Sequence, residues 1–267
     1  MFKSRWQPSL LIRATLVLHG AALFALIAMP VDWRWVLAVL IINHIILTLV
    51  GLWPRSHWLG PNWTRLPAAA TARNEIALTI DDGPDPEVTP RVLDMLARHG
   101  IQATFFCIGE LAQRYPDLCH DIVQRGHAIE NHSQHHRHHF ALLGMSGLTR
   151  EIQAAQAALT DITGQRPLFF RAPAGLRNPF LDPVLARLGL RLASWSVRAF
   201  DTRQGNPETV KRILLKGLHA GAIVLLHDAH AARTPSGNPV ILEVLPALMD
   251  AAAAANLRFV TLRQALS

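Results

Sequence analysis

The chain has 267 residues, of which half are hydrophobic and only 17% are charged, and it carries a formal net charge of +7. This length allows one large domain or two small ones with a buried core, and the composition is apolar for a soluble domain. The positive charge raises nucleic acid as a partner, but the charges are dispersed and no basic run with interleaved aromatic residues occurs. Nucleic-acid binding is therefore not expected, and attraction to anionic lipid is the simpler account.

The apolar excess is concentrated near the N-terminus. Residues 10–53 are almost continuously apolar, interrupted by Arg13 and by one short VDWR stretch. Residues 14–29 and 35–53 each have roughly the length needed to cross ~30 Å of hydrocarbon, and no clear cleavage site follows the first run. We therefore expect residues 1–54 to form a membrane anchor of two transmembrane helices rather than a removed signal peptide.

Cations that flank this hairpin predict its orientation. Three precede the first run, one lies in the joint and three follow the second run: Lys3, Arg5, Arg13, Arg34, Arg55, Arg65 and Arg73. Positive residues are retained on the cytoplasmic side, so everything after the hairpin is expected on the inner side of a bacterial-type cytoplasmic membrane, with membrane lipids as partners. An outward-facing domain is the alternative. Cys107 and Cys119 show no pairing pattern, which fits a reducing compartment.

Strands and helices alternate in the rest of the chain. A proline-containing stretch at residues 55–74 predicts a linker, and the catalytic domain is expected over residues 75–267. The alternation predicts a parallel sheet, either a barrel or a doubly wound layer. The predicted strands are 75–81, 103–109, 127–131, 167–172, 191–197, 222–228 and 258–262, and the predicted helices are 88–100, 116–125, 148–164, 179–188, 207–218 and 239–255.

Polar residues lie where these strands end. In a parallel barrel the carboxyl ends of the strands form one rim, so residues distant in sequence converge there. Polar residues placed at random would not favour one end of the strands, and we therefore predict that these residues form a single site. They are Asp81, Asp82, His132, Arg171, Asp201 and His227.

A histidine-rich stretch, IENHSQHHRHHF at residues 129–140, supplies possible metal ligands. Taken alone, it could be a metal site, a pH-sensitive patch or a low-complexity tract, since histidine-rich tracts are often surface decoration. His132 and His136 stand four residues apart, and two imidazoles with one carboxylate leave a position open for water, a ligand set typical of hydrolytic zinc sites. The acidic stretch TIDDGPDP at residues 79–86 supplies the carboxylates, although Asp-Gly-Pro is also ordinary turn chemistry. Arg171 can orient a carboxylate through two hydrogen bonds, and His227 can donate a proton.

The chain from about residue 75 to 262 resembles the polysaccharide deacetylase family of metal-dependent carbohydrate esterases, which includes chitin, peptidoglycan and nodulation-factor deacetylases. The resemblance implies an α/β fold, a distorted (β/α) barrel that here follows the N-terminal transmembrane hairpin. Four family motifs occur in order: TIDDGP at 79–84, HSQHH at 132–136, RAPAG at 171–175 and LLH at 225–227.

The resemblance also implies roles for individual residues. Asp81 would be the general base, positioned by Arg171, and His227 the general acid, held by Asp201. A divalent metal would be bound by Asp82, His132 and His136; zinc is favoured, with cobalt, nickel or manganese as alternatives. Substrate would contact Pro173, Ala174 and Leu225, with Leu225 lining the pocket for the acetyl group.

Two positions depart from the family pattern. Ala174 stands where the family often has an aromatic residue, which removes a wall of the substrate groove but keeps the backbone N–H that assists an oxyanion. In the fourth motif, WSVRAFDT at residues 195–202, Thr202 replaces the expected tryptophan, although Asp201 is retained. Both changes agree with a substrate other than a long glycan.

The function expected from these features is removal of an acetyl or formyl group from an N-acylated amino sugar. Because the domain is expected on the cytoplasmic side, a lipid-linked sugar or glycolipid precursor is the favoured substrate. One alternative is an exported deacetylase of peptidoglycan, chitin or exopolysaccharide. Another is a catalytically inactive, carbohydrate-binding membrane protein, against which the retained carboxylates and histidines argue.

Overall fold

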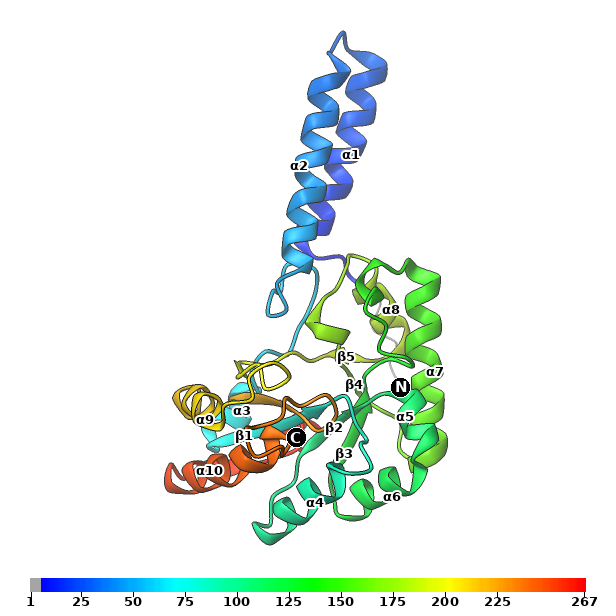
Figure 1. Cartoon of the computed structure of the whole chain (residues 1–267). Helices are drawn as coiled ribbons and strands as arrows, with labels where there is room; N and C mark the ends of the chain where they lie inside the picture. The colour runs from blue at the N-terminus through cyan, green and yellow to red at the C-terminus, as the bar shows by residue number, and fades with distance from the viewer. Residues whose placement is uncertain (1–5) are drawn as a thin grey trace.

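The computed structural model describes residues 6–267 and consists of a helical hairpin that projects from an α/β domain (Figure 1). The hairpin comprises α1 (Leu10–Ala28) and α2 (Trp33–Gly51). Both helices are long and apolar enough to cross a membrane by length and composition, with mean hydropathy of 2.1 and 1.9. Most of their large apolar side chains are exposed, so only a nonpolar surrounding would bury them.

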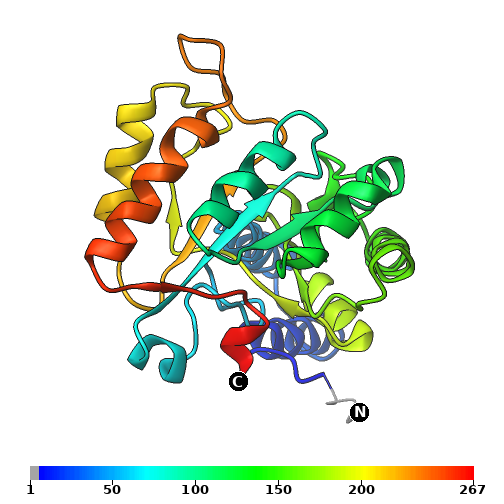
Figure 2. The ribbon, with the colours of Figure 1, turned by 90° about the horizontal axis from the view of Figure 1, so that it is seen from below.

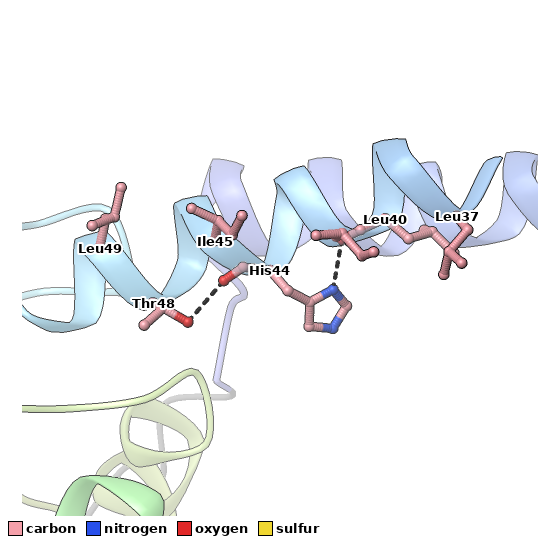
Figure 3. A pocket seen from close by; sticks show the side chains of 7 residues that line it. Leu37, Leu40, His44, Ile45, Thr48 and Leu49 are labelled. Carbon is pink, nitrogen blue, oxygen red and sulfur yellow. Dashed lines mark hydrogen bonds between the residues drawn. The ribbon is translucent and has the colours of Figure 1, made fainter. Parts of the chain in front are cut away.

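Several polar side chains within the hairpin are bonded inside it, although the Asn43 Nδ2 atom is buried without a hydrogen-bond partner among residues 6–267. Thr15 Oγ1 donates to Asn43 Oδ1 of the other helix at 3.1 Å. The His44 Nδ1 atom lies 2.8 Å from the Leu40 carbonyl, and Thr48 Oγ1 donates to the His44 carbonyl (Figure 3). Hydrocarbon offers no hydrogen-bond partners, so this internal pairing suits a membrane-spanning hairpin. The shallow groove in Figure 3 is lined by Leu37, Leu40, Ile41, His44, Ile45, Thr48 and Leu49.

The domain is built on a single sheet whose strands are all parallel. Their order is β5-β4-β3-β2-β1-β7-β6, and β8 pairs with the start of β1. This open barrel confirms the predicted distorted barrel fold. The strands are β1 (Glu75–Asp81), β2 (Thr104–Cys107), β3 (Ala128–Asn131), β4 (Phe169–Phe170), β5 (Arg191–Leu192), β6 (Val197–Arg198), β7 (Ile223–His227) and β8 (Arg258–Phe259).

Residues 191–197, predicted as one strand, form two strands at opposite edges of the sheet. β5 pairs with β4, whereas β6 pairs with β7, so residues 193–196 cross the opening of the barrel. The prediction of one strand was wrong because apolar alternation continues through the crossing. Trp63 forms a parallel bridge with Ala193, and Arg65 forms an antiparallel bridge with Ala222, so the predicted linker helps to close this gap.

Helices cover the sheet and enclose the core (Figure 2). The largest apolar cluster joins β1, β2 and β7 to the inner faces of α4, α9 and α10. The helices of the domain are α3 (Ala68–Ala72), α4 (Thr89–Arg98), α5 (Gly109–Arg114), α6 (Pro116–Gln124), α7 (Met145–Thr163), α8 (Leu181–Leu188), α9 (Pro207–Lys216) and α10 (Val240–Ala254), with 3-10 turns η1 (Phe140–Leu142), η2 (Pro173–Gly175) and η3 (Gln264–Leu266).

The base of the hairpin packs on the loops that follow β4 and β5. Arg177 N donates to the Gly51 carbonyl at 3.1 Å, and a Cβ atom at Gly51 would lie 2.3 Å from the Arg177 carbonyl oxygen. Ser194 Oγ donates to the Pro54 carbonyl at 2.7 Å. The buried Arg177 guanidinium donates to the Ser56 carbonyl. These contacts fix α2 next to the rim of the barrel.

Candidate active site

The predicted site residues do converge on one rim of the barrel. Asp81 ends β1 and is the register partner of His227, which ends β7. Asp82 follows β1, His132 follows β3 and Arg171 follows β4. Parallel pairing brings these carboxyl ends to one edge, which explains why the side chains meet although they are far apart in sequence.

Asp82, His132 and His136 form a cluster that could hold a metal ion. One ligand atom from each residue lies within 4.8 Å of the other two. The Asp82 Oδ1 atom is 3.2 Å from His132 Nε2 and 3.3 Å from His136 Nε2. The Arg171 carbonyl lies 2.8 Å from His132 Nδ1, so this second contact turns Nε2 toward the cluster. The donor set and its outer support fit a divalent cation such as zinc.

Electrostatics keep the three groups in the forms that bind a cation. Burial disfavours the charged form of Asp82, but hydrogen bonds from His132 and His230 hold its pKa well below the usual range. Burial and the neighbouring His132 lower the pKa of His136 to about 4. At neutral pH the site therefore presents an ionised carboxylate and a neutral His136 imidazole, as metal ligation requires.

Asp81 is held by a fully buried arginine. Arg171 Nη1 donates to Asp81 Oδ1 at 2.6 Å and to Thr79 Oγ1 at 2.8 Å. The remaining nitrogens of Arg171 donate to the carbonyls of Ala193 and Ser194 in the crossing segment. The guanidinium is thus fixed on several sides, and it orients one Asp81 oxygen while the other faces the cluster, 3.9 Å from His132 Nε2.

His227 is held in the same way by a buried carboxylate. Its Nδ1 atom lies 2.9 Å from Asp201 Oδ1, and its backbone N–H donates to Asp201 Oδ2 at 2.8 Å. Burial alone would lower the pKa of His227, but the hydrogen bond to Asp201 and the charges of Asp201, Asp81 and Asp82 raise it to about 9. His227 is therefore protonated at neutral pH and can donate a proton through Nε2.

Several loop residues of the site have left-handed backbone conformations. The φ angles are 75° at Asp82, 66° at Ser133, 48° at His136 and 53° at Ala174. Such angles are uncommon for residues other than glycine and concentrate at functional sites. In the histidine loop they are held by side chains, because Ser133 Oγ accepts from the His136 N–H at 3.1 Å and Asn131 Oδ1 accepts from the Ser133 N–H at 2.9 Å.

A pocket of about 290 Å³ lies over these groups. Of the three residues expected to contact substrate, Ala174 and Leu225 line this pocket, whereas Pro173 is buried and is not among the lining residues. Sequence reasoning missed Trp195, Arg198 and Arg203, although the first two stand in the quoted fourth motif. The full lining comprises Asp81, Asp82, His132, His136, His138, Ala174, Gly175, Trp195, Arg198, Thr202, Arg203, Leu225, His227 and His230.

A parallel barrel with an Asp-His-His cluster between an acid and an imidazole is the arrangement of a metal-dependent hydrolase. Residues 68–193 match the family model described as polysaccharide deacetylase. The chitooligosaccharide deacetylase of Azorhizobium caulinodans is 37% identical over 164 residues, which cover 60% of this chain and 78% of that protein. The chain belongs to the polysaccharide deacetylase family.

Another relative is considerably longer. The peptidoglycan-N-acetylglucosamine deacetylase PgdA of Listeria monocytogenes is 35% identical over 178 residues. These residues cover 66% of this chain but 37% of that protein, so the chain spans little more than a third of the relative. The similarity thus concerns the barrel domain and not the whole of the Listeria protein.

Solved structures show the same fold. A crystal structure of a peptidoglycan N-acetylglucosamine deacetylase superposes with a TM-score of 0.69 at 28% identity, covering 76% of this chain and 91% of that one. A CE4 family pseudoenzyme from Bacillus anthracis superposes with a TM-score of 0.66 at 22% identity, covering 73% and 66%. Because the second structure is a pseudoenzyme, the barrel alone does not establish activity. Activity has to be argued from the residues of the site.

Proposed function

We propose that this protein is a membrane-anchored, metal-dependent N-deacetylase that removes an acetyl or formyl group from an amino sugar. One observation carries the proposal. Asp81 and His227 flank the Asp82–His132–His136 cluster within a single pocket, and each has its own buried partner, Arg171 and Asp201. A base, an acid and a cation site in this arrangement supply what amide hydrolysis requires.

Asp82, His132 and His136 would hold the cation. When bound there, a divalent ion, for which zinc is our choice, supplies a Lewis acid that polarises the acyl carbonyl and lowers the pKa of water. Cobalt, nickel or manganese are the alternatives. The second contact of His132 to the Arg171 carbonyl preorganises the imidazole for this role.

The protein groups would handle the protons. Asp81, oriented by Arg171, takes a proton from the attacking water while the water oxygen forms a bond to the acyl carbon. The backbone N–H of Ala174 assists the oxyanion, and Leu225 lines the space for the acyl group. His227 then donates its Nε2 proton to the amine nitrogen as the carbon–nitrogen bond breaks. The products are a free amino sugar and acetate or formate.

A lipid-linked amino sugar is the substrate that we favour. The base of the apolar hairpin contacts the same loops that form the pocket wall, since Pro54 lies next to Gly175 and accepts a hydrogen bond from Ser194. This placement supports a substrate presented at the membrane surface. The cations at the base of the hairpin support a cytoplasmic location, because positive residues are retained on that side.

An exported deacetylase of peptidoglycan, chitin or exopolysaccharide is the second candidate. It is supported by the names of the relatives, one a peptidoglycan and one a chitooligosaccharide deacetylase. An inactive carbohydrate-binding protein is disfavoured, since the chain keeps both carboxylates, both proposed ligand histidines and His227 in one pocket, and Arg171 bonded to Asp81.

Two measurements test the proposal. Full-length protein in lipid nanodiscs, loaded with zinc, should release acetate from N-acetylated amino sugars. If no acetate is released from lipid-linked, oligosaccharide or peptidoglycan substrates, the inactive carbohydrate-binding protein becomes the favoured candidate. A C-terminal alkaline phosphatase fusion should be inactive if the domain is cytoplasmic. Strong phosphatase activity would mean an exported domain and would favour a cell-wall substrate.

A further inference from the structure

The wall of the pocket carries two arginines that the deacetylation chemistry does not use. Arg198 ends β6, and Arg203 lies in the turn that follows it. Neither guanidinium has a carboxylate within 4.0 Å among residues 6–267, whereas Asp81 is paired with Arg171 and Asp201 with His227. These two guanidinium groups make the part of the pocket outside the catalytic groups positively charged.

Arg198 packs against two aromatic rings and has no carboxylate within 4.0 Å among the described residues. Its guanidinium carbon lies 4.9 Å from the Trp195 ring centroid and 5.0 Å from that of Phe200. Phe200 adopts a left-handed φ of 55°, an unusual conformation for an aromatic residue. The Arg198 Nε atom is buried without a hydrogen-bond partner among the described residues. This buried Nε atom is closed to a ligand, whereas no hydrogen bond from the two Nη atoms is found among the described residues. An aromatic-stacked guanidinium with both Nη atoms unused can bind an oxyanion through two parallel hydrogen bonds.

This wall also adjoins the base of the hairpin. Pro54 and Trp195, the residue on which Arg198 stacks, both lie next to Gly175. Ser194 Oγ donates to the Pro54 carbonyl at 2.7 Å, and Arg55 Nη1 donates to the Ser196 carbonyl at 3.3 Å. If the hairpin spans the membrane, these contacts place Arg198 close to the level of the phosphate groups at the lipid surface. A neutral glycan would leave the guanidinium without a partner, and phosphate is the anion expected at that level.

We infer that Arg198, assisted by Arg203, binds a phosphate group carried by the amino-sugar substrate. This inference rests on the proposed function and specifies its substrate class as a phosphate-linked N-acylated amino sugar, attached through that phosphate to a membrane lipid. Arg198 acts here in recognition, while Asp81 and His227 perform the chemistry.

The test compares substrates that share one sugar. Zinc-loaded full-length protein in nanodiscs is given N-acetylglucosamine 1-phosphate, the neutral methyl glycoside of N-acetylglucosamine, and N-acetylglucosamine joined by phosphate to a short prenyl chain. We expect kcat/KM to be about 10–100-fold higher for the phosphate-bearing compounds than for the methyl glycoside, as two charged hydrogen bonds imply. Arg198→Gln should reduce this ratio at least about tenfold, mainly through KM, and Arg198→Lys should retain part of it.

Matched variants keep the result interpretable. Arg212 is exposed on α9 outside the pocket, so Arg212→Gln should leave the ratio unchanged. If Arg198→Gln does not fold, as judged by thermal unfolding and zinc content, Arg203→Gln on the exposed turn replaces it and should reduce the ratio in the same direction.

The outcomes separate this inference from the proposed function. Phosphate recognition would be overturned if all three compounds had similar kcat/KM, or if Arg198→Gln lowered kcat/KM by the same factor for all three. The proposed deacetylase function would still stand in either case. Absence of turnover on every N-acetylated compound and on its N-formyl counterpart would instead reject the proposed function. Faster turnover of the prenyl-linked compound than of the sugar phosphate supports the lipid source, and equal turnover overturns it.

Discussion

Asp81 and His227 are register partners at the carboxyl ends of two adjacent parallel strands, β1 and β7. Neighbouring strands in a sheet lie about 4.8 Å apart, so a base and an acid on paired strands can act on opposite sides of one small reacting group. Asp82 comes one residue later, after the backbone has turned to a φ of 75°, and therefore joins His132 and His136. Two adjacent aspartates thus have different surroundings and, in the proposed mechanism, different tasks.

Replacing Asp81 with Asn should reduce kcat by about 10²–10⁴-fold, because an amide cannot accept the proton from water. The cluster of Asp82, His132 and His136 is unchanged, so zinc content should stay near that of the wild type. Acetate release and elemental analysis of the same preparation measure both quantities. Asp161→Asn on the exposed face of α7 is a matched control. Wild-type turnover in Asp81→Asn would refute the assignment of the base.

The histidine tract offers a direct test of which imidazoles bind metal. His136→Ala should remove a ligand and weaken zinc binding strongly, whereas His139→Ala, three residues further on and exposed, should not. Metal is first removed from each variant with a chelator, and a calorimetric titration with zinc then gives the two affinities. Equal zinc affinity in both variants would mean that the cation site lies elsewhere.

The pKa of His227 predicts how stability depends on pH in metal-free protein. Its folded pKa of about 9 is raised above the ordinary value of 6.5, so the stabilisation is complete below pH 6.5 and is lost as pH rises through about 9. A shift of this size corresponds to roughly 3 kcal/mol. Asp201→Asn removes the hydrogen-bonded charge and should flatten the fall in Tm between pH 6.5 and 9.

Activity should follow the same logic. In zinc-loaded protein, His227 must be protonated to act as the general acid, so the alkaline limb of kcat/KM reports its pKa. Asp201→Asn lowers that pKa and should shift the limb to lower pH, with reduced kcat. Asp161→Asn should leave the profile in place, and an unchanged limb in Asp201→Asn would mean that another group controls it.

Two glycines of the hairpin give a matched test of its attachment. A Cβ atom at Gly51 would meet the Arg177 carbonyl oxygen at 2.3 Å, whereas a Cβ atom at Gly20 would meet nothing within 4 Å. Gly51→Ala should therefore destabilise the contact between α2 and the barrel by about 1–3 kcal/mol, the usual cost of overpacking. Gly20→Ala should be neutral. Thermal unfolding in nanodiscs compares the variants, and equal Tm values would show that α2 is not fixed at this position.

Local patterns in the sequence were enough to predict most of the barrel. Alternating apolar strands and amphipathic helices depend on near neighbours, so the strands ending at Asp81, Asn131 and His227 were predicted close to their actual bounds. The types of residue at the strand ends also predicted the site, because a parallel sheet brings those ends together whatever the details of pairing. The family resemblance then gave each residue a role.

Only the tertiary structure decided what happens between β5 and β6. Residues 191–197 look like one strand, but pairing partners are set by distant segments, and here β4 and β7 take the two halves to opposite edges of the sheet. That crossing places Trp195 and Arg198 on the pocket wall and brings the base of the hairpin against it. Sequence periodicity indicates which face of a helix or strand is apolar. Which strand pairs with which depends on packing between segments distant in sequence, and a local pattern does not determine it.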